Sequence, residues 1–140
     1  MTQEWLFSLT NISVVAKAFA DWRGDRRVFA LHGDMGAGKT TLVHAICRAM
    51  GVKEAMSSPT YSLVNRYVSA ISGEILHMDL YRLADAEEAL EAGIGEDLDS
   101  DAICFVEWPS RAPELLPDTV TDLQLDVLED GRRRLFVRDR

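Results

Sequence analysis

The segment LHGDMGAGKTTLVHAICRAM, residues 31–50, decides the fold of this chain. It contains the pattern G-x-x-x-x-G-K-T from Gly33 to Thr40, preceded by an apolar run and followed by apolar residues at helical spacing. In a phosphate-binding loop of this kind, glycines let successive backbone N–H groups turn towards phosphate oxygens, and the N-terminus of the next helix adds its positive end. Lys39 would supply a charge for the β- and γ-phosphates, and Thr40 a hydroxyl for Mg²⁺. The segment therefore predicts a nucleotide-phosphate site between a strand and a helix.

Apolar periodicity elsewhere predicts the remaining elements. Strands are expected over residues 5–9, 27–33, 61–68, 74–79, 102–107, 120–128 and 133–138, and helices over 12–22, 39–50 and 85–92. Thr10 or Asn11 is the expected cap of the first helix, and residues 109–117 are expected to form a turn or short helix. Asp130-Gly131 predicts a hairpin between the last two strands. Together they predict one α/β domain over residues 1–140, with a mixed, mostly parallel central sheet flanked by helices and antiparallel strands at its edges.

Composition and charge exclude several functional classes. With 47% hydrophobic and 27% charged residues, the chain is typical of a globular protein outside the membrane, and neither a membrane span nor a secretory leader is predicted, so a cytoplasmic location is expected. Cys47 and Cys104 lie in apolar contexts and are predicted to be reduced core residues. Residues 84–101 hold eight acidic and no basic residues, which equals the net charge of −8. This stretch is either a solvated face or a docking surface for a basic partner, and avid binding of nucleic acid by the chain alone is not expected.

Two acids follow apolar runs that are predicted to be strands. Asp79 ends EILHMD and Glu107 ends AICFVE, so both are expected at the carboxyl edge of the sheet, where ligands bind in open α/β folds. Mg²⁺ on a nucleotide needs a second protein oxygen, and Glu107 is the candidate because its strand is the more apolar. Asp79 is the candidate for orienting the attacking water or a magnesium-bound water, although the spacing alone leaves open which acid contacts the metal. His77, two residues earlier, is interpreted as structural.

The segment SSPTYSLV, residues 57–64, is the candidate nucleotide sensor. Pro59 restricts the backbone, while Ser58, Thr60 and Tyr61 offer hydroxyl groups. In nucleotide switches such a hydroxyl contacts the γ-phosphate or its metal ion, and the loop relaxes on hydrolysis. The alternative is a capped loop that leads into a strand. Asp34 needs a separate explanation, because an acid inside the phosphate loop opposes an anion unless its side chain turns away.

Four stretches now stand in order along the chain: GDMGAGKTT (33–41), SSPTYSLV (57–64), HMDLYRL (77–83) and VEWP (106–109). Together they resemble the TsaE family, the small P-loop ATPases of bacterial tRNA threonylcarbamoyladenosine biosynthesis, over about residues 8–130. The resemblance implies a P-loop NTPase fold that binds ATP with Mg²⁺ and works with two partner proteins, TsaD and TsaB. TsaD transfers the threonylcarbamoyl group to N6 of the adenosine beside the anticodon. The TsaE ATPase is weak alone and acts indirectly, so tRNA would be held by the partners.

The resemblance also implies roles for particular residues. Lys39, Thr60 and Asp79 would serve the switch and hydrolysis, and Thr40 and Glu107 would bind magnesium. The nucleotide would be held by Asp34, Met35, Gly36, Ala37, Gly38, Lys39, Thr40 and Thr41 of the loop, by Trp108 beside it, and by Asn11 and Arg133 from the two ends of the chain.

Three other functions fit a phosphate loop. A small-molecule kinase would need an acceptor pocket and usually an arginine-bearing lid, which is not apparent in the sequence. A GTP switch would need an N/T-K-x-D motif to read guanine, and the chain has none. A passive nucleotide-binding adaptor would tolerate loss of Asp79 or Glu107 as long as ATP still binds. The oligomeric state is left open.

Overall fold

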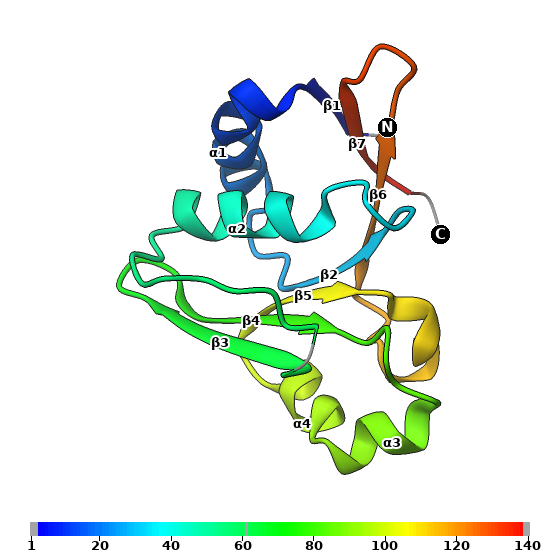
Figure 1. The fold of residues 1–140 in the computed structure, drawn as a ribbon. Coiled ribbons are helices and arrows are strands. Elements are labelled where there is room, and N and C mark those ends of the chain that lie inside the picture. Colours follow the sequence, from blue (N-terminus) through cyan, green and yellow to red (C-terminus); the bar gives the residue numbers. More distant parts are fainter. Residues whose placement is uncertain (1–2, 61, 139–140) are drawn as a thin grey trace.

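A seven-stranded sheet with helices on both faces organises the chain (Figure 1). The computed structural model describes residues 3–60 and 62–138. Its strands are β1 (Glu4–Phe7), β2 (Val28–His32), β3 (Val64–Ser69), β4 (Gly73–Asp79), β5 (Ile103–Glu107), β6 (Thr121–Val127) and β7 (Arg133–Val137). Its helices are α1 (Ile12–Trp22), α2 (Lys39–Ala49), α3 (Ala86–Glu91) and α4 (Ile94–Asp99), with short 3₁₀ turns η1 (Leu9–Asn11), η2 (Pro109–Arg111) and η3 (Pro113–Leu115).

The middle of the sheet is parallel and its edges are antiparallel. The strand order is β1-β7-β6-β2-β5-β4-β3, in which β6, β2, β5 and β4 run parallel to one another. The hairpins β6–β7 and β3–β4 and the pair β1–β7 are antiparallel. The predicted α/β class, with a mostly parallel centre and antiparallel edges, is confirmed.

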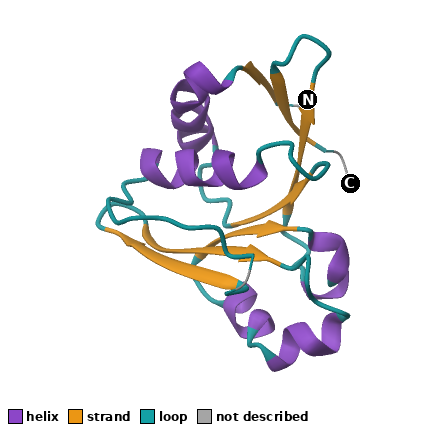
Figure 2. Ribbon diagram, in the orientation of Figure 1, coloured by secondary structure: helices purple, strands orange, loops and turns teal. Residues whose placement is uncertain are grey.

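Helices lie on both faces of the sheet (Figure 2), and a separate cluster of apolar side chains covers each face. Side chains alternate across a strand, so Phe29 and Leu31 of β2 pack under α1 and α2, while Val28 and Ala30 pack against the layer of α3 and α4. Phe105 of β5 joins the first layer and stacks on Phe29 with ring centroids 5.3 Å apart. Burial on both faces explains why the central strands read as continuous apolar runs.

Several element boundaries differ from the sequence prediction. The first strand ends at Phe7, because residues 9–11 turn into η1. Asn11 does not cap α1 with its side chain, whose Oδ1 instead accepts a hydrogen bond from Ser8 N at 2.8 Å. The strand expected over 61–68 begins only at Val64, after Leu63 with its positive φ of 71°, and Tyr61 lies outside the described residues.

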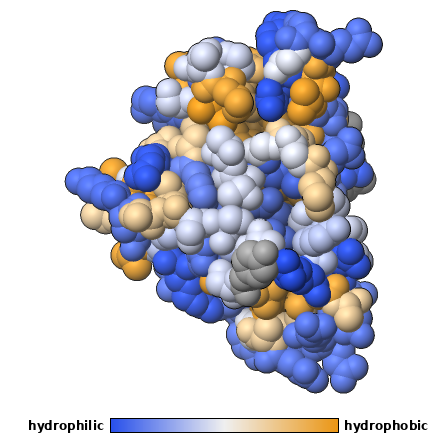
Figure 3. Space-filling model, in the orientation of Figure 1, coloured by the Kyte–Doolittle hydropathy of each residue, from blue (hydrophilic) through white to orange (hydrophobic). Residues whose placement is uncertain are grey.

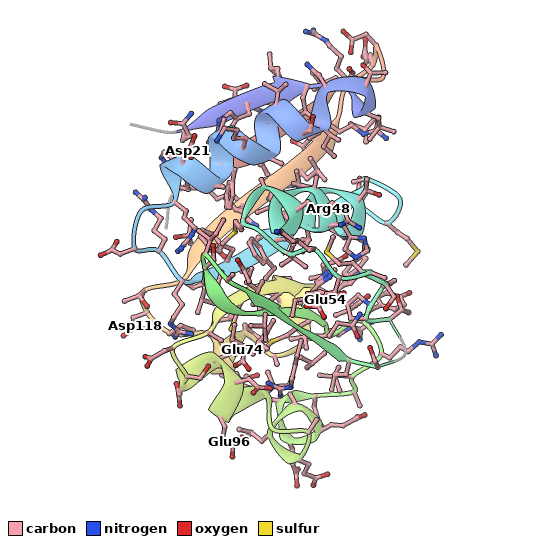
Figure 4. All side chains as sticks on the ribbon, turned by 90° about the vertical axis from the view of Figure 1, so that its left-hand side faces the viewer. Asp21, Arg48, Glu54, Glu74, Glu96 and Asp118 are labelled. Atoms are coloured by element: carbon pink, nitrogen blue, oxygen red, sulfur yellow. The ribbon has the colours of Figure 1, made fainter. Side chains whose placement is uncertain are left out.

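The acidic stretch contains two helices where the sequence predicted one over residues 85–92. Gly93 adopts a left-handed conformation (φ 84°) that ends the turn after α3 and starts α4. The two helices form the lower end of the molecule, where Figure 4 labels Glu96, far from Asp21 of α1 at the other end. The outer residues of the two helices are mostly exposed, and hydrophilic residues, drawn in blue, dominate this end of the molecule in Figure 3. One of the acids, Asp97, forms an ion pair with Arg66 at 2.8 Å. Across the described ranges, none of the helices has the length and apolarity to cross a membrane.

Candidate functional site

The loop between β2 and α2 has the backbone shape that the glycine pattern predicts. Gly38 is left-handed (φ 98°) and stands directly before the first residue of α2, with nothing within 4 Å of the position a Cβ would take. At Gly33 a Cβ would meet the carbonyl oxygen of Leu125, on β6, at 2.7 Å. The open side of the loop at Gly38 suits an approaching anion, and the close packing at Gly33 requires glycine.

The side chain of Lys39 lies between the start of this loop and the Trp108 ring. Its Nζ donates a hydrogen bond to the carbonyl oxygen of Gly33 at 2.6 Å and lies 3.8 Å from the ring centroid of Trp108. The residue is only 5% exposed, and burial lowers the pKa of its ammonium below the ordinary 10.5, although nearby carboxylates, above all that of Glu107, raise it. The ammonium is thus held over the loop, where a phosphate group would meet it.

The two strand-end acids lie side by side. In the parallel register of β4 and β5, Asp79 is directly opposite Glu107, and both are buried (6% and 3% exposed). Their predicted position at the carboxyl edge of the sheet is confirmed. Thr40, the second residue of α2, donates its hydroxyl to Glu107 Oε2 at 2.8 Å. Glu107 is therefore the acid that the structure pairs with the phosphate loop.

Asp79 is instead paired with the candidate sensor. Its Oδ2 accepts a hydrogen bond from the Thr60 hydroxyl at 3.3 Å, and its Oδ1 accepts one from the backbone N–H of Tyr81 at 3.0 Å. The Thr60 hydroxyl also lies 2.7 Å from that of Ser58. Among the described residues, Thr60 is thus held by the side chains of Ser58 and Asp79. Its bond to the Asp79 carboxylate is long, and a ligand could replace it.

The start of the sensor segment is held much more firmly. The carbonyl oxygen of Ser57 lies within hydrogen-bond distance of His44 Nε2 (3.1 Å), Asn65 Nδ2 (2.8 Å) and the Tyr67 hydroxyl (3.3 Å). These three side chains come from α2 and β3. They fix the backbone at Ser57, three residues before Thr60.

A cavity of about 500 Å³ unites these parts. It is lined by Met35, Gly36, Gly38, Lys39, Thr40, Thr41, Thr60, Asp79, Tyr81, Arg82, Glu107 and Trp108. A second cavity of about 570 Å³ lies on the other side of the loop, against the β6–β7 hairpin, and includes Asp34 and Ala37. Asp34 thus lines a different cavity from Lys39, although its charge is close enough to raise the pKa of Lys39.

The residues expected from the two ends of the chain lie apart from this group. Asn11, in η1, and Arg133, at the start of β7, line neither of the two cavities. Arg133 Nη1 donates to the carbonyl oxygen of Gly131 at 2.8 Å. Their contact with a nucleotide stays a prediction.

Sequence reasoning missed two residues that line the cavity. Tyr81 and Arg82 line the cavity directly after Asp79, and Tyr81 packs on Trp108 with ring centroids 4.9 Å apart. Their position just beyond the carboxyl end of a parallel strand was the available signal. His77, interpreted from sequence as structural, is completely buried with its Nε2 2.5 Å from Glu107 Oε2. No sequence pattern indicates that contact, because it depends on the pairing of β4 with β5.

The donor set fits a magnesium–nucleotide complex. Among residues 3–60 and 62–138, no group of three or more His, Cys, Asp or Glu side chains could hold a metal ion by itself. A cation at Thr40 and Glu107 would therefore need oxygens from a bound ligand or water. Mg²⁺ is held in this way at nucleotide sites, by one or two protein oxygens plus phosphates.

Several known proteins are similar in sequence to this chain. A family model described as threonylcarbamoyl adenosine biosynthesis protein TsaE matches residues 7–135. A tRNA threonylcarbamoyladenosine biosynthesis protein TsaE from Haemophilus influenzae is 41% identical over 103 residues, which cover 73% of this chain and 64% of that relative. The protein of the same name from Treponema pallidum is 34% identical over 110 residues, covering 79% of this chain and 80% of the relative. The match therefore spans just under two thirds of the Haemophilus protein and four fifths of the Treponema protein.

A solved structure supports the fold. The crystal structure of Bacillus subtilis YdiB superposes with a TM-score of 0.73 over 98% of this chain and 84% of that chain, at 22% sequence identity. At that identity the likeness concerns the fold, which agrees with a P-loop α/β architecture.

Proposed function

This chain belongs to the TsaE family of threonylcarbamoyl adenosine biosynthesis proteins, and on that premise we propose that it is a Mg²⁺-dependent ATPase that serves the N6-threonylcarbamoylation of the tRNA adenosine next to the anticodon. It does not transfer the threonylcarbamoyl group. It acts on the partner proteins TsaD and TsaB, which hold the tRNA in the cytoplasm. The observation that carries the ATPase proposal is that Lys39, Thr40 and Thr60 line one cavity with both strand-end carboxylates.

Each of these side chains has a chemical task in hydrolysis. The loop N–H groups and Lys39 bind the phosphates. Thr40 and Glu107 would hold Mg²⁺, which neutralises charge on the phosphates when bound. The Asp79 carboxylate accepts a hydrogen bond from the attacking water and orients this water. The Thr60 hydroxyl gives up its bond to Asp79 and contacts the ligand instead.

Coupling to a partner follows from the two ends of the sensor segment. Ser57 is fixed by three side chains from α2 and β3, whereas Thr60 bonds to Ser58 of its own segment and, by a long bond, to Asp79. A ligand that draws Thr60 away changes the course of residues 58–60 while β3 stays in place. The surface beside the cavity thereby differs between the nucleotide-bound and nucleotide-free states, and a partner protein can recognise this difference.

ATP turnover by the purified chain, alone and with TsaB, TsaD and tRNA, tests the proposal. We expect slow turnover alone, stimulation by the complex, and loss of the stimulated rate in Asp79→Ala and Glu107→Ala. Equal turnover with and without the complex contradicts the coupling. Transfer of phosphate to a metabolite without any protein partner would favour the alternative, a small-molecule P-loop kinase. An Asp79→Ala protein that binds ATP and still supports tRNA modification would identify a passive adaptor.

A further inference from the structure

His77 is a buried polar residue that the proposed ATPase does not use directly. It lies on β4 two residues before Asp79, is 0% exposed, and does not line the 500 Å³ cavity. Its Nε2 lies 2.5 Å from Glu107 Oε2. The histidine therefore stands behind the carboxylate, on the side away from the ligand.

The contact fixes the tautomer of the imidazole. A Glu107 carboxylate that binds a cation is ionised and only accepts hydrogen bonds, so in that state His77 Nε2 carries the proton and donates the hydrogen bond to Glu107. Nδ1 is buried and, among the described residues, has no hydrogen-bond partner. Burying an imidazole with one unpaired nitrogen is unfavourable compared with an apolar side chain of the same size, so packing does not explain a histidine here.

The same carboxylate oxygen receives a second hydrogen bond. Thr40 donates to Glu107 Oε2 at 2.8 Å, so one oxygen is held from two sides, by a helix and by a strand. Glu107 Oε1 has no hydrogen bond to any described residue, and Glu107 lines the cavity. The two donors thus fix the rotation of the carboxylate and leave one oxygen for a ligand.

We propose that His77 is a positioning residue that holds Glu107 in the orientation needed to bind a divalent cation together with Thr40. The proposal rests on the magnesium site of the proposed function and adds a residue to it. Hydrogen bonds to ligating carboxylates orient them before the metal arrives, and their loss typically weakens metal binding by about 10–100-fold. His77 acts through Glu107 and does not itself touch the metal.

The test measures metal affinity and needs no turnover. Mn²⁺ replaces Mg²⁺ as a paramagnetic probe, and its binding in the presence of a non-hydrolysable ATP analogue is followed by electron paramagnetic resonance. His77→Leu keeps the volume and removes the donor, whereas His77→Gln keeps an N–H near the position of Nε2. We expect His77→Leu to weaken Mn²⁺ binding by at least about tenfold, His77→Gln to restore most of that loss, and metal-free affinity for the analogue to stay unchanged in both.

A neighbouring histidine provides the control. His44 on α2 packs edge-on against the His77 ring, with centroids 5.6 Å apart, but has no hydrogen bond to Glu107. If positioning by the Nε2–H bond is correct, His44→Gln, which removes the ring but keeps an N–H near the Ser57 carbonyl oxygen, leaves Mn²⁺ affinity within about twofold of the parent value. An equal loss in His44→Gln and His77→Leu would attribute the effect to ring packing and overturn the proposal. Thermal unfolding of each variant confirms that it is folded before its metal affinity is compared.

The remaining outcomes separate this role from the function it rests on. Parental Mn²⁺ affinity in a folded His77→Leu protein overturns the positioning role and leaves the magnesium site intact. Failure of the parent protein to bind Mn²⁺ with the nucleotide, or an unchanged affinity in Glu107→Gln, overturns the magnesium site and the role of His77 with it. Rescue of turnover in His77→Leu by excess Mg²⁺, with no such rescue in Asp79→Ala, would support positioning, because only the former is impaired in metal binding.

Discussion

Replacing Lys39 by alanine tests whether the loop from Gly33 to Thr40 binds phosphate. A unit charge on the ammonium and one on a phosphate about 4 Å away attract by about 4 kcal/mol at an effective dielectric constant of about 20. In the structure the ammonium donates to the Gly33 carbonyl oxygen at 2.6 Å. This hydrogen bond involves a charged group and contributes about 2 kcal/mol. If Lys39 gives it up when it binds a phosphate, the net gain in binding free energy is about 2 kcal/mol. The expected loss of ATP affinity in Lys39→Ala therefore lies between about thirtyfold and about a thousandfold.

The fold should survive this substitution. Lys39→Ala removes the bond to Gly33 and the contact with the Trp108 ring, but it also removes an ammonium that is disfavoured by burial, as its lowered pKa indicates. These effects oppose each other, so we expect the midpoint of thermal unfolding to move by less than about 4 °C, which corresponds to about 1 kcal/mol for a chain of this size.

Titration calorimetry is the suitable assay, since Lys39 lies on the Trp108 ring and the substitution itself would change tryptophan fluorescence. Lys53→Ala is the matched control, because Lys53 is exposed, follows α2 and lines neither cavity. A Lys39→Ala protein that unfolds cooperatively and binds ATP within about threefold of the Lys53→Ala control would refute the assignment of the phosphate loop.

Three further predictions follow from local geometry. Gly33→Ala places a Cβ 2.7 Å from the Leu125 carbonyl oxygen, so the loop must shift, with an expected loss of about 1–3 kcal/mol in urea-induced unfolding; an unchanged midpoint would contradict the close packing. Burial raises the pKa of Cys47 to about 12 and that of Cys104 to about 11, against 9.0 for an exposed thiol. Unfolded thiols therefore lose their protons first, and the free energy of unfolding should fall above pH 9 by up to about 1.4 kcal/mol per pH unit for each thiol, a slope that replacing both by alanine should remove. Thr60→Val deletes a hydroxyl that has a 3.3 Å bond to Asp79 and a 2.7 Å bond to the exposed Ser58, so stability should change by less than about 0.5 kcal/mol while the stimulated ATP turnover drops by about a hundredfold; a variant with parental turnover would remove the residue from the switch.

The parts predicted well from sequence are those whose signal is local. The phosphate loop is one continuous segment, and its glycines and helix start carry the physical reason for their conformation. Asp79 and Glu107 were placed correctly because parallel strands end at the same edge of a sheet, wherever each strand lies. The alternation of the last two strands and Asp130-Gly131 likewise predict a hairpin without knowledge of the rest of the fold.

What the sequence did not reveal depends on pairings between distant segments. His77 and Phe105 are opposite each other in the register of β4 and β5, and this pairing brings the imidazole to Glu107. The sequence around a histidine in an apolar stretch is the same whether the ring only packs in the core or also donates a hydrogen bond. The left-handed backbone at Leu63 is also a tertiary effect, because its carbonyl oxygen accepts from Asp79 N at 3.0 Å, and no local preference of leucine indicates it.

The pairing of β1 with β7 has a consequence for how the protein is made. Glu4 is opposite Phe136 and Phe7 is opposite Arg133, so β1 forms its ladder with β7, which leaves the ribosome after β1 to β6. Until then Trp5 can pack on Trp22 and Phe19 of α1, but its strand has no neighbour in the sheet. Closing such a long loop makes this edge a late step in folding. In a nascent chain arrested before residue 133, α2 and the phosphate loop should therefore already resist proteolysis, whereas β1 should still be cleaved.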